Sequence, residues 1–153
     1  MGEVRVEGFL ADSVVTVEGK LYVLGAGWNR VNVALFPARH DRIGVGLLLH
    51  VEAGSAREAR SFELAITGPD GSELALGEGP GGTVRRISGE FTAGGADEQI
   101  VPIAVNLNGV PLERPGDYRV IVSVEAREAK TLPFRVQSLA TQERSTTGGS
   151  GYL

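Results

Sequence analysis

The sequence contains no cysteine, one tryptophan and one methionine among 153 residues. The absence of cysteine excludes a disulfide-stabilised scaffold and any zinc or iron–sulfur site with cysteine ligands. The longest apolar run, residues 43–49, is far shorter than the roughly 20 residues that span a bilayer. The N-terminus also lacks the basic start and apolar run of a secretory signal. The sequence therefore predicts a soluble, cytoplasmic protein without a membrane partner.

Basic residues are outnumbered, with 15 Lys and Arg against 19 Asp and Glu, and the formal net charge is −4. Proteins that bind nucleic acid carry a basic surface, so we expect no nucleic-acid partner. Hydrophobic residues make up 42% of the chain, which is enough to bury a core and argues against disorder. The length fits a single domain.

Apolar residues recur at every second position in many short segments, a pattern typical of strands with one buried face. The clearest stripe lies within residues 41–52 and consists of Ile43, Val45, Leu47, Leu49 and Val51. Glycine, proline and aspartate separate the segments, and none has the length and period of an ordinary helix. The pattern predicts an all-β fold, an antiparallel two-sheet β-sandwich of immunoglobulin-like type with 8–9 strands. An up-and-down barrel is the alternative.

Three segments carry sharper expectations. Because proline cannot donate a backbone hydrogen bond, Pro102 predicts that the strand at residues 101–107 lies at a sheet edge or contains a bulge. The turn Pro69-Asp70-Gly71 predicts a hairpin over residues 61–76. The glycine-rich residues 77–82 are expected to form a plain mobile connector.

Tyr118 follows a turn signal, Pro115-Gly116-Asp117, and begins a clean apolar stripe. In sandwich domains a tyrosine at the start of such a strand often bonds through its hydroxyl to the preceding connection. We therefore expect Tyr118 to stabilise the fold through a buried hydroxyl.

The composition changes near residue 138. Residues 1–137 carry the alternating stripes and are expected to form the β-sandwich domain. Residues 138–153 are polar and rich in glycine, serine and threonine, and a segment of this composition cannot bury a core of its own. We expect this C-terminal tail to dock on a neighbouring chain.

The irregular segment after the second apolar run, residues 21–25, holds the residues best suited to contact a ligand or partner: Trp28, Asn29, Arg30, His40 and Asp41. Gly25-Ala26-Gly27 begins like a dinucleotide-binding fingerprint. However, Arg30 stands where the third glycine is needed, and no helix pattern follows. A bend at which Trp28 packs against a sheet is the favoured interpretation.

Metal binding and catalysis find little support in the sequence. The two histidines occur as His40-Asp41 and His50-x-Glu52, and ten residues of extended chain would separate the histidines by about 30 Å. There is no cysteine nucleophile and no Gly-x-Ser-x-Gly motif. We therefore predict no metal, no cofactor and no catalytic residue.

Two stretches resemble the members of an uncharacterised family of small bacterial β-sandwich proteins, a domain of unknown function. The first stretch contains Ala11-Asp12-Ser13, Gly19-Lys20-Leu21 and Gly25-Ala26-Gly27-Trp28, and the second contains Pro115-Gly116-Asp117-Tyr118 and Phe134-Arg135-Val136. The resemblance covers roughly residues 3–137. It implies a fold and no activity, so it assigns no functional residue.

Two functions remain open from the sequence. The first is a non-catalytic protein-interaction or assembly module of a bacterial or phage complex, in which the partner is another protein or a further copy of the chain. Such a module acts through sheet edges and termini. The alternative is a small-ligand-binding β-sandwich or enzyme with a site around residues 28–41, which requires a pocket with convergent polar groups.

Overall fold

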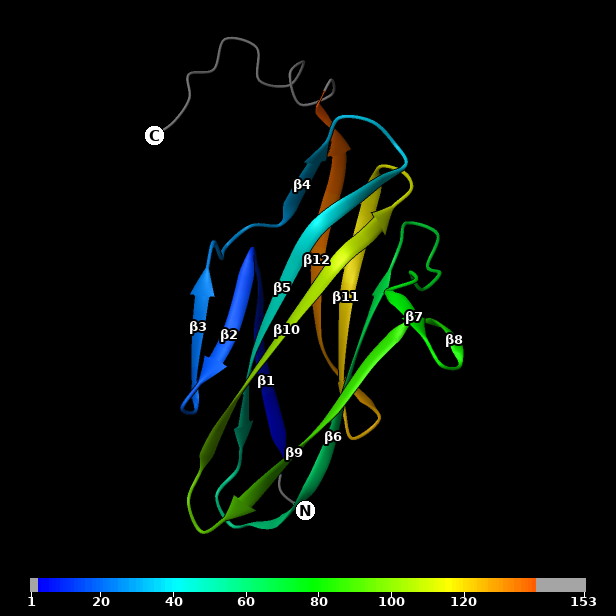
Figure 1. Cartoon of the computed structure of the whole chain (residues 1–153). Coiled ribbons are helices and arrows are strands. Elements are labelled where there is room, and N and C mark those ends of the chain that lie inside the picture. Colours follow the sequence, from blue (N-terminus) through cyan, green and yellow to red (C-terminus); the bar gives the residue numbers. More distant parts are fainter. Residues whose placement is uncertain (1–2, 140–153) are drawn as a thin grey trace.

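The computed structural model describes residues 3–139, and all twelve elements of regular structure in this range are β-strands (Figure 1). They are β1 (Val4–Ala11), β2 (Ser13–Val17), β3 (Lys20–Leu24), β4 (Arg30–Val33), β5 (Ala38–Val51), β6 (Ser55–Thr67), β7 (Gly77–Gly79), β8 (Gly82–Val84), β9 (Arg86–Gly95), β10 (Gln99–Leu112), β11 (Gly116–Val124) and β12 (Arg127–Ser138). The prediction of an all-β chain is confirmed.

Two larger sheets and two small hairpins contain these strands. One sheet has the order β1-β5-β10 and the other the order β4-β12-β11-β6-β9, while β2–β3 and β7–β8 each form a separate two-stranded sheet. The described pairs are antiparallel except β4 with β12, which is parallel. Twelve strands exceed the predicted 8–9, partly because residues 77–82, predicted as a plain connector, contribute to the β7–β8 hairpin.

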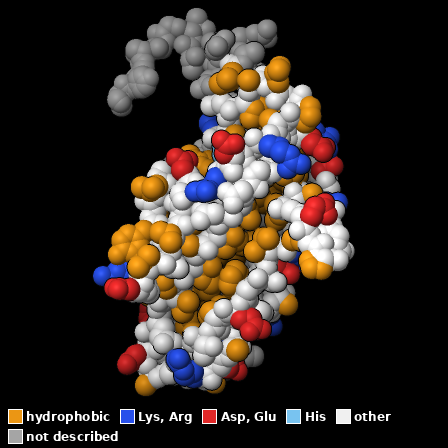
Figure 2. Space-filling model, in the orientation of Figure 1, with side chains coloured by type: hydrophobic (Ala, Val, Ile, Leu, Met, Phe, Trp, Pro, Cys, Tyr) orange, Lys and Arg blue, Asp and Glu red, His pale blue; other side chains and the backbone are white. Residues whose placement is uncertain are grey.

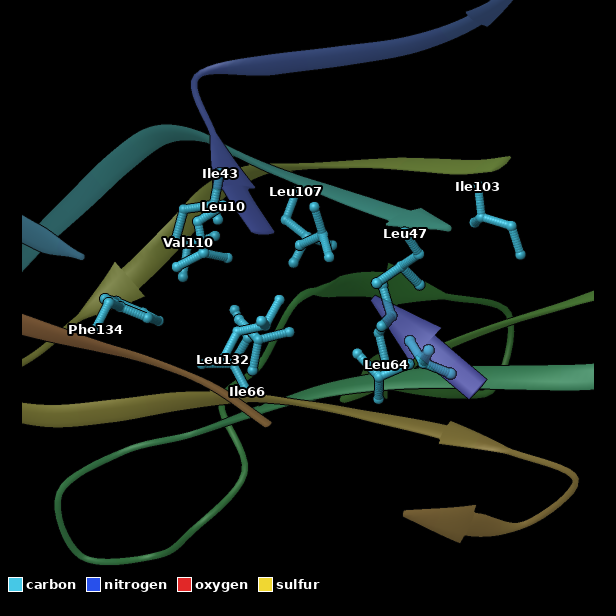
Figure 3. Close-up of a cluster of buried hydrophobic side chains, with 14 of the residues drawn as sticks. Leu10, Ile43, Leu47, Leu64, Ile66, Ile103, Leu107, Val110, Leu132 and Phe134 are labelled. Atoms are coloured by element: carbon cyan, nitrogen blue, oxygen red, sulfur yellow. The ribbon is translucent and has the colours of Figure 1, made fainter. Parts of the chain in front are cut away.

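One hydrophobic core lies between the two larger sheets (Figure 3). Ile43 and Leu47 of β5 and Leu107 of β10 point toward Leu64 and Ile66 of β6 and Leu132 of β12. The predicted β5 stripe, Ile43 to Val51, is completely buried. Full burial of one such side chain stabilises the folded state by about 1.5–3 kcal/mol, so this alternation is the main source of the fold.

Strand β10 lies at the edge of its sheet, as Pro102 predicted. Its pairing with β5 continues through Pro102, which lies opposite Leu48. A proline is tolerated there because an edge strand has a side on which no N–H donor is needed.

The hairpin predicted over residues 61–76 is wrong in its pairing, although its turn is right. Gly71 has the positive φ of 83° that the turn requires, and Asp70 Oδ1 accepts a 3.0 Å hydrogen bond from the Ser72 N–H. Beyond the turn, the arms share a single bridge, Thr67 with Glu73. Strand β6 pairs instead with β9 and β11, which satisfy the backbone groups along both of its edges.

The C-terminal boundary lies close to the predicted position. Strand β12 ends at Ser138, one residue beyond the predicted domain limit at 137. The predicted tail from residue 140 onward lies outside the described residues, so its docking on a neighbour stays a prediction. Within residues 3–139, no helix is long and apolar enough to cross a membrane.

Candidate interaction surface

The hairpin β2–β3 lies on the outer face of the three-stranded sheet, away from the core. Strand β2 follows β1 after one residue, and the corner between them passes directly over β5. A Cβ atom on Gly44 would lie 3.1 Å from the carbonyl oxygen of Ala11, and one on Gly46 would lie 2.6 Å from the ring of Phe9. Glycine at these two positions of β5 therefore permits the close approach of the corner and the hairpin.

Asn106 of β10 fastens the hairpin to the sheet. Its Oδ1 accepts a 3.1 Å hydrogen bond from the Val14 N–H, and its Nδ2 donates a 2.8 Å hydrogen bond to the Val14 carbonyl. The side-chain amide thus pairs with β2 as a neighbouring strand would. The Val14 side chain is buried beneath the hairpin, so β2 is held at this point by both packing and hydrogen bonds.

The opposite face of the hairpin is apolar and open to solvent. The register pairs Val15 with Tyr22 and Ser13 with Leu24, so the side chains of alternate residues share one face. We call Val15, Val17, Tyr22 and Leu24 the apolar hairpin face; their exposed fractions range from 48% to 72%. Figure 2 shows hydrophobic side chains gathered over this hairpin, at the left of the molecule.

The apolar hairpin face is unusual within the described part of the chain. Seven large hydrophobic residues are exposed between residues 3 and 139, and four of them form this one face. Single exposed hydrophobic side chains are common on soluble proteins, whereas contiguous apolar patches mark interaction sites.

A shallow depression of about 420 Å³ adjoins the hairpin. Leu21 and Val23 of β3 line one wall, and Phe9, Leu48, Ile100 and Pro102 of the three-stranded sheet belong to the lining, with Gly19 and Lys20 at the turn. Ile100 is itself 56% exposed. The depression therefore lies between the inner face of the hairpin, opposite the apolar hairpin face, and the edge strand β10.

The predicted site residues are only partly brought together. Trp28 makes edge contacts with His40, at a ring-centroid distance of 6.2 Å, and with Phe134, at 6.4 Å. The interpretation of Trp28 as packed against a sheet is therefore confirmed, although its buried Nε1 has no hydrogen-bond partner. Asp41 is exposed and follows His40 on β5, so its side chain points to the opposite face of the strand.

Asn29 and Arg30 contribute to a second depression, of about 350 Å³, on the outer face of the five-stranded sheet. Its lining comprises Asn29, Arg30, Asp117, Tyr118, Arg119, Pro133, Phe134 and Arg135. Arg30 lies beside Arg135 in register, and Arg135 lies beside Asp117 with 3.5 Å between Nη1 and Oδ1. Three arginines and one carboxylate thus line this depression, and the excess of positive charge favours an anion.

The two histidine motifs lie in separate environments. His50 Nε2 lies 2.9 Å from Glu7 Oε1, and its Nδ1 lies 3.9 Å from Glu98 Oε1. A hydrogen bond from Arg5 holds the pKa of the Glu7 carboxyl below its usual value. Glu52, the acidic residue of the His50-x-Glu52 motif, accepts a hydrogen bond from the Glu3 N–H. Between residues 3 and 139, no three His, Asp or Glu side chains are grouped to hold a metal ion.

The sequence signal for the hairpin is a continuous apolar run, which differs from the alternating pattern of a strand with one buried face. Residues 21–24 are apolar at every position, and residues 14–15 form a similar pair. A strand with two apolar faces is normally buried on both sides. The hairpin packs on a sheet with one face alone, so its second apolar face is exposed to solvent and is available to another protein surface.

Comparison with solved structures gives distant matches of varied function. An alkylpurine DNA glycosylase from Pseudomonas fluorescens matches with 13% identity and a TM-score of 0.48; the match covers 88% of this chain but 30% of that one. A β-glucosidase from Listeria innocua matches with 9% identity and a TM-score of 0.47, over 89% of this chain and 16% of that one. The chain therefore spans less than a third of these two proteins.

An immunoglobulin-like protein from Pseudomonas aeruginosa matches over 88% of this chain and 96% of its own length, with 15% identity and a TM-score of 0.40. No curated protein matches the sequence. A family model matches residues 8–137, and its description is a family of unknown function (DUF6941).

Proposed function

Because the chain belongs to DUF6941, a family of unknown function, we propose its role from its own surfaces: a non-catalytic protein-interaction or assembly module. The apolar hairpin face carries this proposal. Four large side chains are exposed together on one hairpin, and water makes such a face unfavourable unless another protein surface covers it.

We also propose that the scaffold is an immunoglobulin-like two-sheet sandwich. Two features support it: the shared core between the larger sheets, and the hydrogen bond from the Tyr118 hydroxyl to the Arg114 carbonyl. A tyrosine that bonds back to the backbone a few residues upstream is a feature of such domains.

The placement of the hairpin favours interaction over a structural role for its exposed face. Val14 and Asn106 fasten the hairpin from its inner side, so the fold does not use the outer side chains. Among the described strands, β3 pairs with β2 alone, so its other edge has no partner strand within residues 3–139. An open strand edge beside an apolar face is a common means of peptide and protein recognition.

Site-specific photo-crosslinking tests this function in the cell that naturally makes the protein. A photoreactive phenylalanine analogue replaces Tyr22 on the apolar hairpin face, and in a control variant it replaces Leu35, which is 80% exposed elsewhere. We expect covalent protein adducts from position 22 and few from position 35. Absence of adducts at position 22 contradicts an interaction through the hairpin.

A second candidate function is the binding of a small anionic ligand in the depression lined by Arg30, Arg119 and Arg135. The observation that favours it is the excess of guanidinium groups over carboxylates there. Its test compares thermal unfolding in phosphate and in chloride at equal ionic strength. We expect phosphate to raise the unfolding temperature of the natural chain more than that of Arg30→Gln, and equal shifts contradict the site.

A further inference from the structure

We propose that His50 is a proton-sensitive latch: a protonated imidazole ties the connection between β9 and β10 to strand β1, and loss of the proton releases that connection. The inference goes beyond the proposed function, which uses no titrating group. It rests on the positions of two carboxylates on either side of the imidazole ring.

His50 is the second-last residue of β5, at the end of the strand that lies beside the β9–β10 connection (Figure 1). Its neighbours in sequence, Leu49 and Val51, belong to the core, so the imidazole points to the outer face of the three-stranded sheet. In register it lies between Arg5 of β1 and Ile100 of β10. The side chain is nevertheless only 14% exposed, so neighbouring side chains surround most of the ring.

A carboxylate lies beside each ring nitrogen. Glu7 Oε1 of β1 is 2.9 Å from Nε2, and Glu98 Oε1 is 3.9 Å from Nδ1. Glu98 is the last residue of the connection, residues 96–98, and directly precedes β10. Three segments that are distant in the sequence therefore meet at one imidazole.

A neutral imidazole does not satisfy this arrangement. It has one N–H donor and one bare acceptor nitrogen, and a carboxylate has no proton to donate. In either tautomer, a bare nitrogen therefore faces a negative charge. Both nitrogens of His50 are buried without an aligned hydrogen bond among residues 3–139, although the oxygen of Glu7 is close. Buried polar atoms left in this way cost free energy.

An imidazolium removes the conflict, because it carries an N–H on both nitrogens. Each carboxylate then accepts a charge-assisted hydrogen bond, which is stronger than a neutral one. The Glu98 side chain is 65% exposed, so it is free to rotate and close the remaining distance. The protonated ring thus bridges β1 and the connection.

The other charged groups around the ring also favour its protonated form. Arg5 carries a like charge, but its Nη1 donates a 2.9 Å hydrogen bond to Glu7 Oε1. This bond holds the pKa of the Glu7 carboxyl below its usual value, so Glu7 stays ionised where histidine gains its proton. Glu52, two residues after His50, adds a further carboxylate, which accepts a hydrogen bond from the N–H of Glu3.

The connection is the element that the latch holds or releases. Hydrogen bonds without titrating groups fasten its two flanks: the Gly54 N–H donates to the Gly95 carbonyl at 2.9 Å, and the Gly94 N–H donates to Gln99 Oε1 at 2.7 Å. Residues 96–98 between these flanks are exposed. Among the described side-chain contacts, the one that holds this segment is that of Glu98 with His50. Histidine changes its charge between about pH 5 and 8, so we expect an ordered connection near pH 6 and a released one near pH 8.

Nuclear magnetic resonance of the ring nitrogens tests the latch in the full chain. The chain has two histidines, and His40, which contacts Trp28, serves as the internal control. Glu98→Gln should lower the midpoint of the His50 titration by about 0.2–0.7 pH unit, the equivalent of one exposed ion pair, and leave that of His40 unchanged. Glu90→Gln, an exposed change on β9, should move neither midpoint. A His50 midpoint that does not fall in Glu98→Gln overturns the latch.

Backbone order of the connection is the second readout, because a histidine that only stabilises the fold would not change it. Amide order parameters of residues 96–98 should be higher at pH 6 than at pH 8, whereas those of residues 70–72, whose hydrogen bonds involve no histidine, should be equal. The difference should be lost in His50→Gln and also in Glu98→Gln, which alters an exposed side chain and so protects the test if His50→Gln does not fold. Equal order at both pH values in the natural chain, or a difference that persists in Glu98→Gln, overturns the latch.

Discussion

The hydroxyl of Tyr118 donates a 2.7 Å hydrogen bond to the backbone carbonyl of Arg114, and the Tyr118 ring stacks on Phe134 with 5.5 Å between centroids. The expected buried hydroxyl is therefore present, since Tyr118 is 1% exposed. The bond closes the turn at residues 114–117 against the start of β11 and ties the connection to the core.

Replacing Tyr118 by phenylalanine should lower the free energy of unfolding by about 1 kcal/mol, because the Arg114 carbonyl loses its donor while the ring contacts remain. A shift in the urea midpoint measures the effect. Tyr22→Phe makes the same chemical change at an exposed ring and should leave the midpoint unchanged. An unchanged midpoint in Tyr118→Phe would show that the hydrogen bond adds nothing to stability.

The same tyrosine should also titrate abnormally. Burial raises the pKa of the Tyr118 phenol above its ordinary value of about 10, because the low-dielectric core disfavours the phenolate. The stability that this shift contributes is complete below the unfolded-state pKa and is lost as the pH rises through the folded-state pKa. Tyrosinate absorbance at increasing pH should show a late step that Tyr118→Phe removes; a late step that persists in this variant excludes Tyr118 as its source.

Gly46→Ala should destabilise the fold by about 1–3 kcal/mol, a typical effect of overpacking. Its Cβ would lie 2.6 Å from the Phe9 ring and 3.2 Å from Leu21, so the corner and the hairpin would have to move outward. Chemical denaturation measures the effect. Gly81→Ala is the control, since an added Cβ there meets nothing within 4 Å. Equal stability of both variants contradicts the close packing of the hairpin.

Asn106→Ala should loosen the hairpin and lower the free energy of unfolding by about 1–3 kcal/mol, because two backbone groups of Val14 lose their partners. Hydrogen exchange of residues 13–24 should accelerate. Asn108→Ala removes an exposed amide from the same strand, whose Oδ1 accepts a bond from Arg42, and should leave exchange in the hairpin nearly unchanged. Equal exchange in both variants would show that Asn106 does not fasten β2.

Local patterns predict the parts of this fold that local chemistry determines. The alternation of residues 43–51 identifies a buried strand because each second side chain points to the same face. Pro102 identifies an edge strand, because proline has no N–H to donate to a neighbouring strand. Tyr118 identifies a buried hydroxyl, because a tyrosine at the start of such a strand bonds to the preceding connection.

Local patterns do not specify which distant segments pair with each other. Strand β4 pairs in parallel with β12, over a hundred residues later, through Arg30 and Arg135. No feature of either segment specifies the other, because parallel pairing is decided by how the whole core packs. For the same reason the sequence placed Arg30 in a candidate site with His40, whereas the structure groups Arg30 with Arg119 and Arg135.

The apolar hairpin face is an exception to the usual relation between hydrophobic pattern and burial. Leu24 is 72% exposed and Leu49 is fully buried, although both occur in apolar runs. The difference arises because Leu49 faces the core between the two larger sheets, whereas Leu24 lies on the face of the hairpin that no described element covers. The sequence shows that a side chain is hydrophobic, but it does not show whether the core or another protein surface buries that side chain.

Removal of residues 140–153 tests the predicted tail separately from the hairpin. A cut after Leu139 leaves β12 complete, and its last residues keep their pairing with β4, Gln137 beside Asn32 and Ser138 beside Val33. The folded domain should therefore keep its urea midpoint, because the core lies before the cut.

If the tail docks on a neighbouring copy, the dissociation constant measured by sedimentation should rise, since the contacts of the tail are lost. A variant with residues 140–153 in scrambled order keeps the length and composition and should associate as weakly as the truncated chain. Identical association of the natural and truncated chains excludes a docked tail.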